Sequence, residues 1–256
     1  MSGSWSRVKP ALETGGPQGA AAVVRETGGT ARLGLWDEIL QAAGGEDWAG
    51  KSLDTRLALA RLAMADALEL EAAARPRDAE QADKLLDQAN IWSFNLAADL
   101  AECWPGDEEP RTDHHREAGL AAALDCLQWR RQLRKGPFPF ALAWWARGIH
   151  ELALGRPVEA ERSFSEAAAC GRRLAQEQGR SVEVDGHSVY MHLLNAGYAG
   201  IARAAGGDSE GRATLERCLE AFAEQAILHA DEAEDAAFGV DQLRHTARRF
   251  LPDDAA

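Results

Sequence analysis

Histidines and carboxylates are the residues of this sequence whose types and spacing come nearest to a metal-binding or acid–base site. The densest polar cluster is Asp113-His114-His115. Adjacent residues on a helix point in different directions, so these two histidines do not form an obvious chelating pair. His187 lies five residues before His192, which misses the four-residue spacing that places two imidazoles on one helix face. Taken singly, each cluster is more typical of solvated or capping residues than of metal ligands.

A metal site is nevertheless one of two interpretations, because distant helices can bring separate histidines together. Its ligands would be His114, His150 and His187 with the carboxylate of Asp113. His150-Glu151 does not itself make the HExxH motif of zinc proteases, since residue 154 is leucine. The chain also lacks a GxSxG nucleophile elbow and a Walker A loop. An all-helical, metal-dependent enzyme is therefore the alternative function, and we rank it below a non-enzymatic function that needs no cofactor.

The elements that must position these residues are predicted to be helices. Apolar residues make up 46% of the 256 residues, which is enough for a sizeable core. Alanine is abundant, tyrosine is rare, and few stretches are rich in valine or isoleucine, a balance that favours helices over strands. We therefore predict an all-α fold built from antiparallel helical hairpins.

Residues 144–167 show the hairpin pattern in full. Six residues follow one another at intervals of four, seven, five, four and three: Trp144, Gly148, Gly155, Ala160, Phe164 and Ala167. Gly155 is expected to end the first helix in a left-handed conformation, and Pro157 to begin the second helix. Trp144 is expected to fill the space between the two helices, where Gly148 faces Ala160 and allows a close approach.

This pattern resembles the tetratricopeptide repeat, a helix-turn-helix unit that stacks into solenoids. The resemblance is complete only over residues 144–167, and the rest of the chain reads as poorer copies. The equivalent alanines Ala82, Ala118, Ala160 and Ala213 are 36, 42 and 53 residues apart, whereas a regular array repeats about every 34 residues. The expected architecture is therefore either an irregular tetratricopeptide-like solenoid or a compact helical bundle.

Three regions are predicted along the chain. Residues 1–33 contain Gly-Gly pairs and two prolines without periodicity, and are expected to be a flexible extension. Residues 34–250 are expected to form the helical repeat domain, in which a new hairpin begins near Ile91, Thr112 or Asp113 caps a helix, and a last helix over 233–250 closes the end of the stack. Residues 251–256 are expected to be a loose acidic tail.

The net charge of −13 bears on the partners. So acidic a chain is unlikely to bind nucleic-acid phosphates or anionic membranes, but it suits a basic protein partner. Apolar runs stay below the roughly 18 residues of a membrane span, and 19–24 is too short for a secretory signal. Cys126, Cys170 and Cys218 sit among apolar neighbours and are expected to be buried free thiols. These features predict a cytoplasmic protein.

A tryptophan next to the hairpin is the leading binding candidate. Trp145 points about 100° away from Trp144 on a helix, toward either the concave groove of a repeat stack or the neighbouring hairpin. Tryptophan is frequent at binding hot spots, and Arg147 and Arg130 could border such a groove and bind a carboxylate or an acidic peptide. Asn195 completes the predicted set. The resemblance to tetratricopeptide proteins implies a scaffold, an adaptor, or a regulator or inhibitor that holds a segment of another protein.

Overall fold

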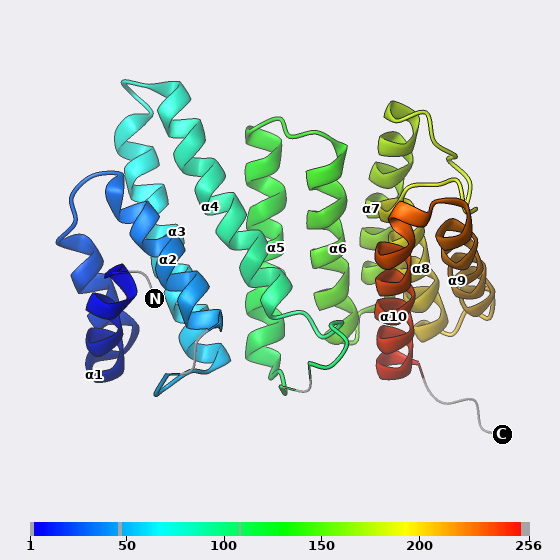
Figure 1. The fold of residues 1–256 in the computed structure, drawn as a ribbon, viewed down its shortest axis with the longest axis horizontal. Coiled ribbons are helices and arrows are strands. Elements are labelled where there is room, and N and C mark those ends of the chain that lie inside the picture. The colour runs from blue at the N-terminus through cyan, green and yellow to red at the C-terminus, as the bar shows by residue number, and fades with distance from the viewer. Residues whose placement is uncertain (1–2, 46–47, 108, 252–256) are drawn as a thin grey trace. The chain divides into compact units, whose positions relative to one another are not determined.

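The protein is described by a computed structural model that covers residues 3–45, 48–107 and 109–251. Within these ranges the chain forms ten α-helices and one short 3-10 helix, without strands (Figure 1). The predicted all-α class is therefore confirmed. The helices are α1 (Gly3–Arg25), α2 (Ala31–Gly45), α3 (Leu53–Ala74), α4 (Ala79–Asp99), α5 (Asp113–Gln132), α6 (Pro137–Ala153), α7 (Pro157–Glu177), α8 (Tyr190–Ala205), α9 (Glu210–Leu228), η1 (Ala230–Glu232) and α10 (Ala233–Phe250).

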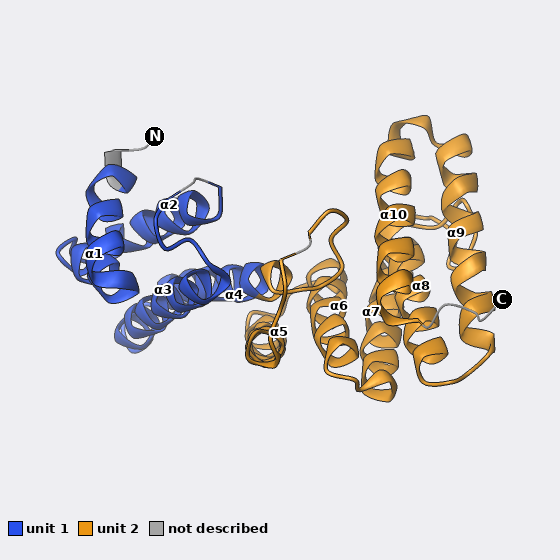
Figure 2. Ribbon diagram, turned by 90° about the horizontal axis from the view of Figure 1, so that it is seen from below, with its two compact units in different colours: residues 1–96 blue, residues 97–256 orange. Residues whose placement is uncertain are grey.

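The chain divides into two compact units, residues 1–96 and residues 97–256 (Figure 2). The first unit contains α1 to α3 and most of α4, and the second contains the end of α4 and α5 to α10. Each unit is described here by itself.

In the first unit, the expected flexible extension is largely helical, so that expectation was wrong for its described part. α1 bends sharply at Gly16, whose φ of 62° is left-handed. The two halves then lie so close that a Cβ on Gly19 would overlap the carbonyl oxygen of Ala11. Trp5 and Val8 are fully buried. The glycines and prolines that suggested disorder instead produce a tight reversal between two short helical segments.

A second correction concerns α4, which runs without a break through Ile91, where a new hairpin was expected. No glycine or proline interrupts residues 79–99, so nothing local stops the helix. Trp92 on this helix donates a hydrogen bond to the Asp37 carboxylate of α2 at 2.6 Å. The helix therefore serves as one long packing surface where two short ones were expected.

In the second unit, α5 to α9 follow one another in alternating directions, each packed against the next (Figure 1). The predicted turn of the α6–α7 hairpin is confirmed, whereas the atoms nearest to Gly148 belong to Phe164 and not to the expected Ala160. Gly155 ends α6 with a φ of 70°, and Pro157 is the first residue of α7. Gly148 is packed so closely that a Cβ there would lie 2.7 Å from the Phe164 ring. Thr112 caps α5, as expected, through a reciprocal pair of bonds with His115.

The last helix has the predicted bounds but a broader contact surface than an end cap. α10 packs on α8 and α9, where its Leu243 lies against Gly197 of α8. It also contacts the segment that follows α4, since Arg249 donates to Glu102 at 2.8 Å and Gln242 contacts Cys103. Side-chain hydrogen bonds thus connect α10 to the segment 102–103, and α10 also packs on α8. Of the predicted tail, Leu251 is buried and residues 252–256 lie outside the described residues.

The described helices include none that is both long enough and apolar enough to span a bilayer. The four cysteines are buried free thiols, as predicted for three of them.

Candidate functional site

The predicted groove tryptophan is a core residue. Trp145 is only 4% exposed. Its ring centroid lies 5.6 Å from that of Trp104 and 6.4 Å from that of Tyr198 on α8. The neighbouring Trp144 is the accessible one, because α6 has α5 and α7 on either side and residues near 104 over the face that carries Trp145. Trp145 therefore occupies the second of its two expected positions, packed against neighbouring segments, and Trp144 is partly buried beside α7.

The other three predicted binding residues do not border a common groove. Arg130 is buried and donates to the carbonyl oxygen of Pro139. Asn195 is fully buried and donates to the carbonyl oxygen of Met191 at 2.7 Å. Arg147 is partly exposed, but its guanidinium already pairs with Glu151 at 2.7 Å.

Arg147 also lies 5.2 Å from the centroid of the Trp144 ring, and both residues line a small cavity of about 240 Å³. That cavity has carboxylates as well as guanidinium groups in its wall, since Glu159 and Glu166 face it with Arg162. The basic edge predicted for an acidic ligand is therefore balanced by acidic side chains.

The residues proposed for a metal site are separated into different local environments. Asp113 pairs with Arg116 at 2.7 Å, and exposed His114 has His115 as its ring neighbour. His187 has its ring 5.8 Å from that of His229. Across residues 3–45, 48–107 and 109–251, no three His, Cys, Asp or Glu side chains are grouped to hold an ion. The expected convergence of His114, His150 and His187 is thus absent from the structure.

His150 is instead a packed core residue. Its ring fills the space left by Gly119 on α5, where a Cβ would overlap it. Its Nε2 lies 2.8 Å from the carbonyl oxygen of Ala97, so this nitrogen carries the proton and donates it. Burial lowers the pKa of His150 from 6.5 to about 4. An imidazole held neutral in this way serves packing and helix positioning.

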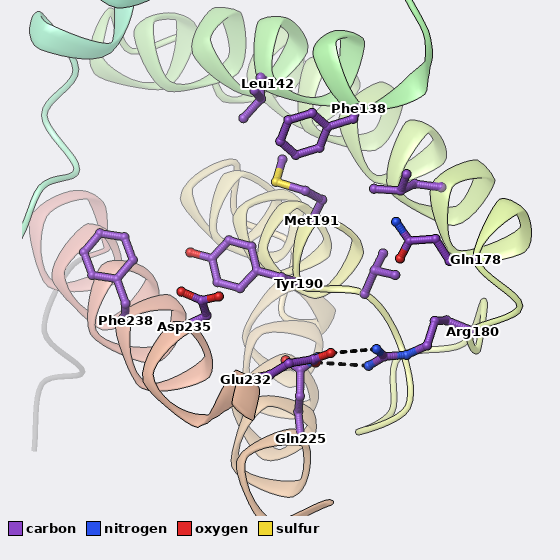
Figure 3. Close-up of a pocket in the computed structure, with 12 residues that line it drawn as sticks. Phe138, Leu142, Gln178, Arg180, Tyr190, Met191, Gln225, Glu232, Asp235 and Phe238 are labelled. Atoms are coloured by element: carbon purple, nitrogen blue, oxygen red, sulfur yellow. Dashed lines mark hydrogen bonds and ion pairs between the residues drawn. The ribbon is translucent and has the colours of Figure 1, made fainter. Parts of the chain in front are cut away.

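The structure brings together a different set of residues, around a cavity of about 790 Å³ that we call the α6–α10 cavity (Figure 3). It lies where α6, α8 and α10 begin and where α7 and α9 end. Its lining residues are Phe138, Leu142, Leu174, Gln178, Arg180, Val189, Tyr190, Met191, Gln225, Glu232, Asp235 and Phe238.

One end of the α6–α10 cavity is apolar. Phe138 and Leu142 come from the first turns of α6, and Met191 comes from the first turn of α8 (Figure 3). Pro137 begins α6 at the position where proline is favoured, and this places Phe138 at the rim of the cavity, where it is 46% exposed. These side chains form an apolar wall that part of a ligand can contact.

The opposite end is polar and largely hydrogen-bonded within the protein, but the buried side-chain oxygen Oε1 of Gln225 has no hydrogen-bond partner among the described residues. Arg180 forms two bonds with the Glu232 carboxylate, at 2.7 and 3.1 Å, and donates to the carbonyl oxygens of His187 and Ser188 (Figure 3). Gln225 donates to Ser188 at 3.0 Å and to Glu232 at 2.8 Å. The hydrogen bond from Arg180 lowers the pKa of Glu232. This network ties the loop after α7 to the start of α10 and so holds the cavity wall in place.

The third side contains two rings and a carboxylate. Tyr190, Asp235 and Phe238 lie next to one another in Figure 3. Burial, and then the charge of Asp235, raise the pKa of the Tyr190 hydroxyl, so the ring is neutral. Asp235 is exposed and accepts no hydrogen bond and forms no ion pair within the described part of the chain.

Sequence reasoning selected none of the twelve lining residues. They come from segments spread over residues 138–238, and no short motif joins them. The available signals were the aromatic Pro-Phe-Pro-Phe break at 137–140 and the acidic cluster at 231–235, each of which reads as a loop or a solvated surface on its own. Comparison of the chain with protein-family models, with curated proteins and with solved structures found no match.

Proposed function

We propose that this chain is a non-enzymatic, tetratricopeptide-like helical module that binds a segment of another protein, as an adaptor, regulator or inhibitor. The binding site in this proposal is the α6–α10 cavity. The observation that carries the proposal is the cavity itself, whose volume of about 790 Å³ falls within the roughly 300–1,000 Å³ of ligand pockets. Free, buried thiols are consistent with a reducing, cytoplasmic setting.

The distribution of chemistry around the cavity supports a peptide ligand. An apolar wall at Phe138 and Leu142 offers area that a ligand side chain can bury. The Arg180–Glu232 pair fixes the opposite wall before any ligand binds, so little ordering cost falls on the protein. Walls drawn from several helix ends suit an extended segment that inserts one or two side chains.

The cavity also replaces the site expected from the resemblance. In a tetratricopeptide stack the partner would contact the face that carries Trp145, but Trp104 and Tyr198 pack against that ring in this chain. A partner would have to displace the protein's own core to reach Trp145. The α6–α10 cavity is accessible without such a rearrangement.

The test is a selection of random peptides displayed on phage against the full chain, followed by binding measurements with two matched variants. Leu142→Trp places a large ring in the cavity wall, whereas Leu124→Trp makes the same change on α5 at a position that is 44% exposed. We expect selected peptides to bind the Leu124→Trp protein as they bind the wild type. Binding to Leu142→Trp should weaken about tenfold or more.

Circular dichroism and thermal unfolding would verify that both variants fold. Failure to select any peptide, or equal binding of the selected peptides to both variants, would contradict the proposal.

A further inference from the structure

We infer that the α6–α10 cavity recognises a cationic side chain, lysine or arginine, next to an apolar residue in the bound segment. In this arrangement the cation pairs with Asp235 beside Tyr190 and Phe238, and the apolar residue contacts Phe138 and Leu142. The inference rests on the proposed function and names the chemistry of the ligand.

The charges in the cavity wall leave a carboxylate without a counterion. Arg180 is the cationic side chain of the wall, and Glu232 neutralises it through two hydrogen bonds. Its remaining bonds go to backbone carbonyl oxygens, so it has little capacity left for an anionic ligand. Asp235 is the second carboxylate of the wall, and it has no ion-pair partner among the described residues. The wall therefore carries one unbalanced negative charge.

Aromatic rings stand beside this charge. Tyr190, whose hydroxyl is near enough to feel the charge of Asp235, and Phe238, three residues after Asp235 on α10, line the cavity with it (Figure 3). Phe238 is 45% exposed, and its ring is stacked on that of Trp104. Cations are attracted both to a carboxylate and to the faces of aromatic rings, so the same side chain can use both contacts. An anionic or purely apolar group would leave the charge of Asp235 unpaired.

The helix dipoles at the beginnings of α8 and α10 disfavour a bound cation, because the amino ends of helices attract anions. In α10, however, the first turn already contains Glu234 and Asp235, which offset that field. The chain as a whole carries a net charge of −13, which steers basic partners toward it. The local and the overall charge therefore both favour a cation.

The apolar requirement follows from the other end of the same cavity. Phe138, Leu142 and Met191 form a surface that lies beyond Tyr190 in Figure 3. A peptide with a basic residue alone would leave this surface covered by water, so an apolar neighbour should increase its affinity.

The experiment compares the selected peptides and then dissects the best one. We expect the peptides that depend on the cavity to share a lysine or arginine near an apolar residue. In the best peptide, replacing the cation by norleucine should weaken binding to the wild type about fivefold to tenfold. Asp235→Asn should weaken binding of the unchanged peptide by a similar factor. The Asp235→Asn protein should then bind the norleucine peptide almost as well as it binds the unchanged peptide, because the ion pair is already absent.

Glu234→Gln is the matched control, because it removes the same charge one residue earlier on α10 and does not line the cavity. We expect less than a twofold effect from it. An equal loss in Glu234→Gln and Asp235→Asn would mean that only the overall charge matters, and would overturn the inference. A purely apolar or an acidic consensus that still depends on Leu142 would also overturn it while leaving the proposed function intact. Absence of any peptide that depends on the cavity would contradict both.

Discussion

Protonation of His150 should make the protein less stable in mild acid, by an amount that the structure allows us to calculate. The imidazole is 1% exposed and donates to the carbonyl oxygen of Ala97. Burial lowers its pKa from 6.5 to about 4. In the unfolded chain the same group regains its ordinary pKa, so between these two values the unfolded state binds a proton that the folded state does not.

The difference between the two pKa values determines whether stability rises or falls with pH. Because the folded pKa is the lower one, the contribution of His150 to stability is fully present above pH 6.5 and is lost as the pH falls toward 4. Each pKa unit corresponds to about 1.4 kcal/mol. Between pH 7.5 and pH 5.0 the expected loss is about 2 kcal/mol, since protonation of the unfolded state is favoured over 1.5 of the 2.5 units in that interval.

The assay is urea unfolding at pH 7.5 and pH 5.0, followed by circular dichroism, with wild type and His150→Gln compared at each pH. Glutamine keeps an N–H donor for Ala97 but does not titrate. Other groups, including buried His192 with its pKa lowered to about 4, contribute equally to both proteins and cancel in the comparison. We expect the wild type to lose about 2 kcal/mol more than the variant on acidification.

If His150→Gln lost as much stability as the wild type between the two pH values, the burial argument for His150 would be refuted.

Three further outcomes follow from the packing in the second unit. Gly148→Ala should destabilise the protein by about 1–3 kcal/mol in urea unfolding, because the added Cβ would lie 2.7 Å from the Phe164 ring. Trp145→Ala should lower the free energy of unfolding by about 3–5 kcal/mol because it empties a buried site. Trp144→Ala should lower it clearly less, and equal losses would contradict the assignment of Trp145 to the core. Glu232→Gln weakens the ion pair that holds the loop after α7, so limited proteolysis or hydrogen exchange should show faster opening of that loop, and unchanged rates would show that the pair does not restrain it.

The sequence-based predictions succeeded where local chemistry determines the structure. A left-handed glycine followed by a proline can form few backbone arrangements, so Gly155 and Pro157 located the α6–α7 turn correctly. The cap at Thr112 depends on a side chain bonding to the backbone three residues away, which the sequence also displays. In each case the interacting groups are neighbours in the chain.

The predictions failed where tertiary neighbours determine the structure. Adjacent tryptophans 144 and 145 differ in burial because Trp104 and Tyr198, from distant segments, cover only one of them. The glycines near the N-terminus suggested a flexible extension because their local composition does not reveal that Trp5 finds a core. The α6–α10 cavity was missed for the same reason, since its walls come from separate helix ends. The spacing of apolar residues along a helix shows which face is buried, but it does not show which distant segment packs against that face.

The position of α10 connects these failures. In its middle and last turns, Leu243 lies against Gly197 of α8 and Thr246 lies near Tyr198 of the same helix. The Tyr198 ring in turn contacts Trp145. The first turns of α10 place Asp235 and Phe238 in the cavity wall. The same helix thus packs against Tyr198, whose ring neighbours Trp145, and forms part of the cavity in which we propose that the partner is held. The ion pair between Arg180 and Glu232 joins the residue just before α10 to the loop after α7 and so restrains the start of this helix.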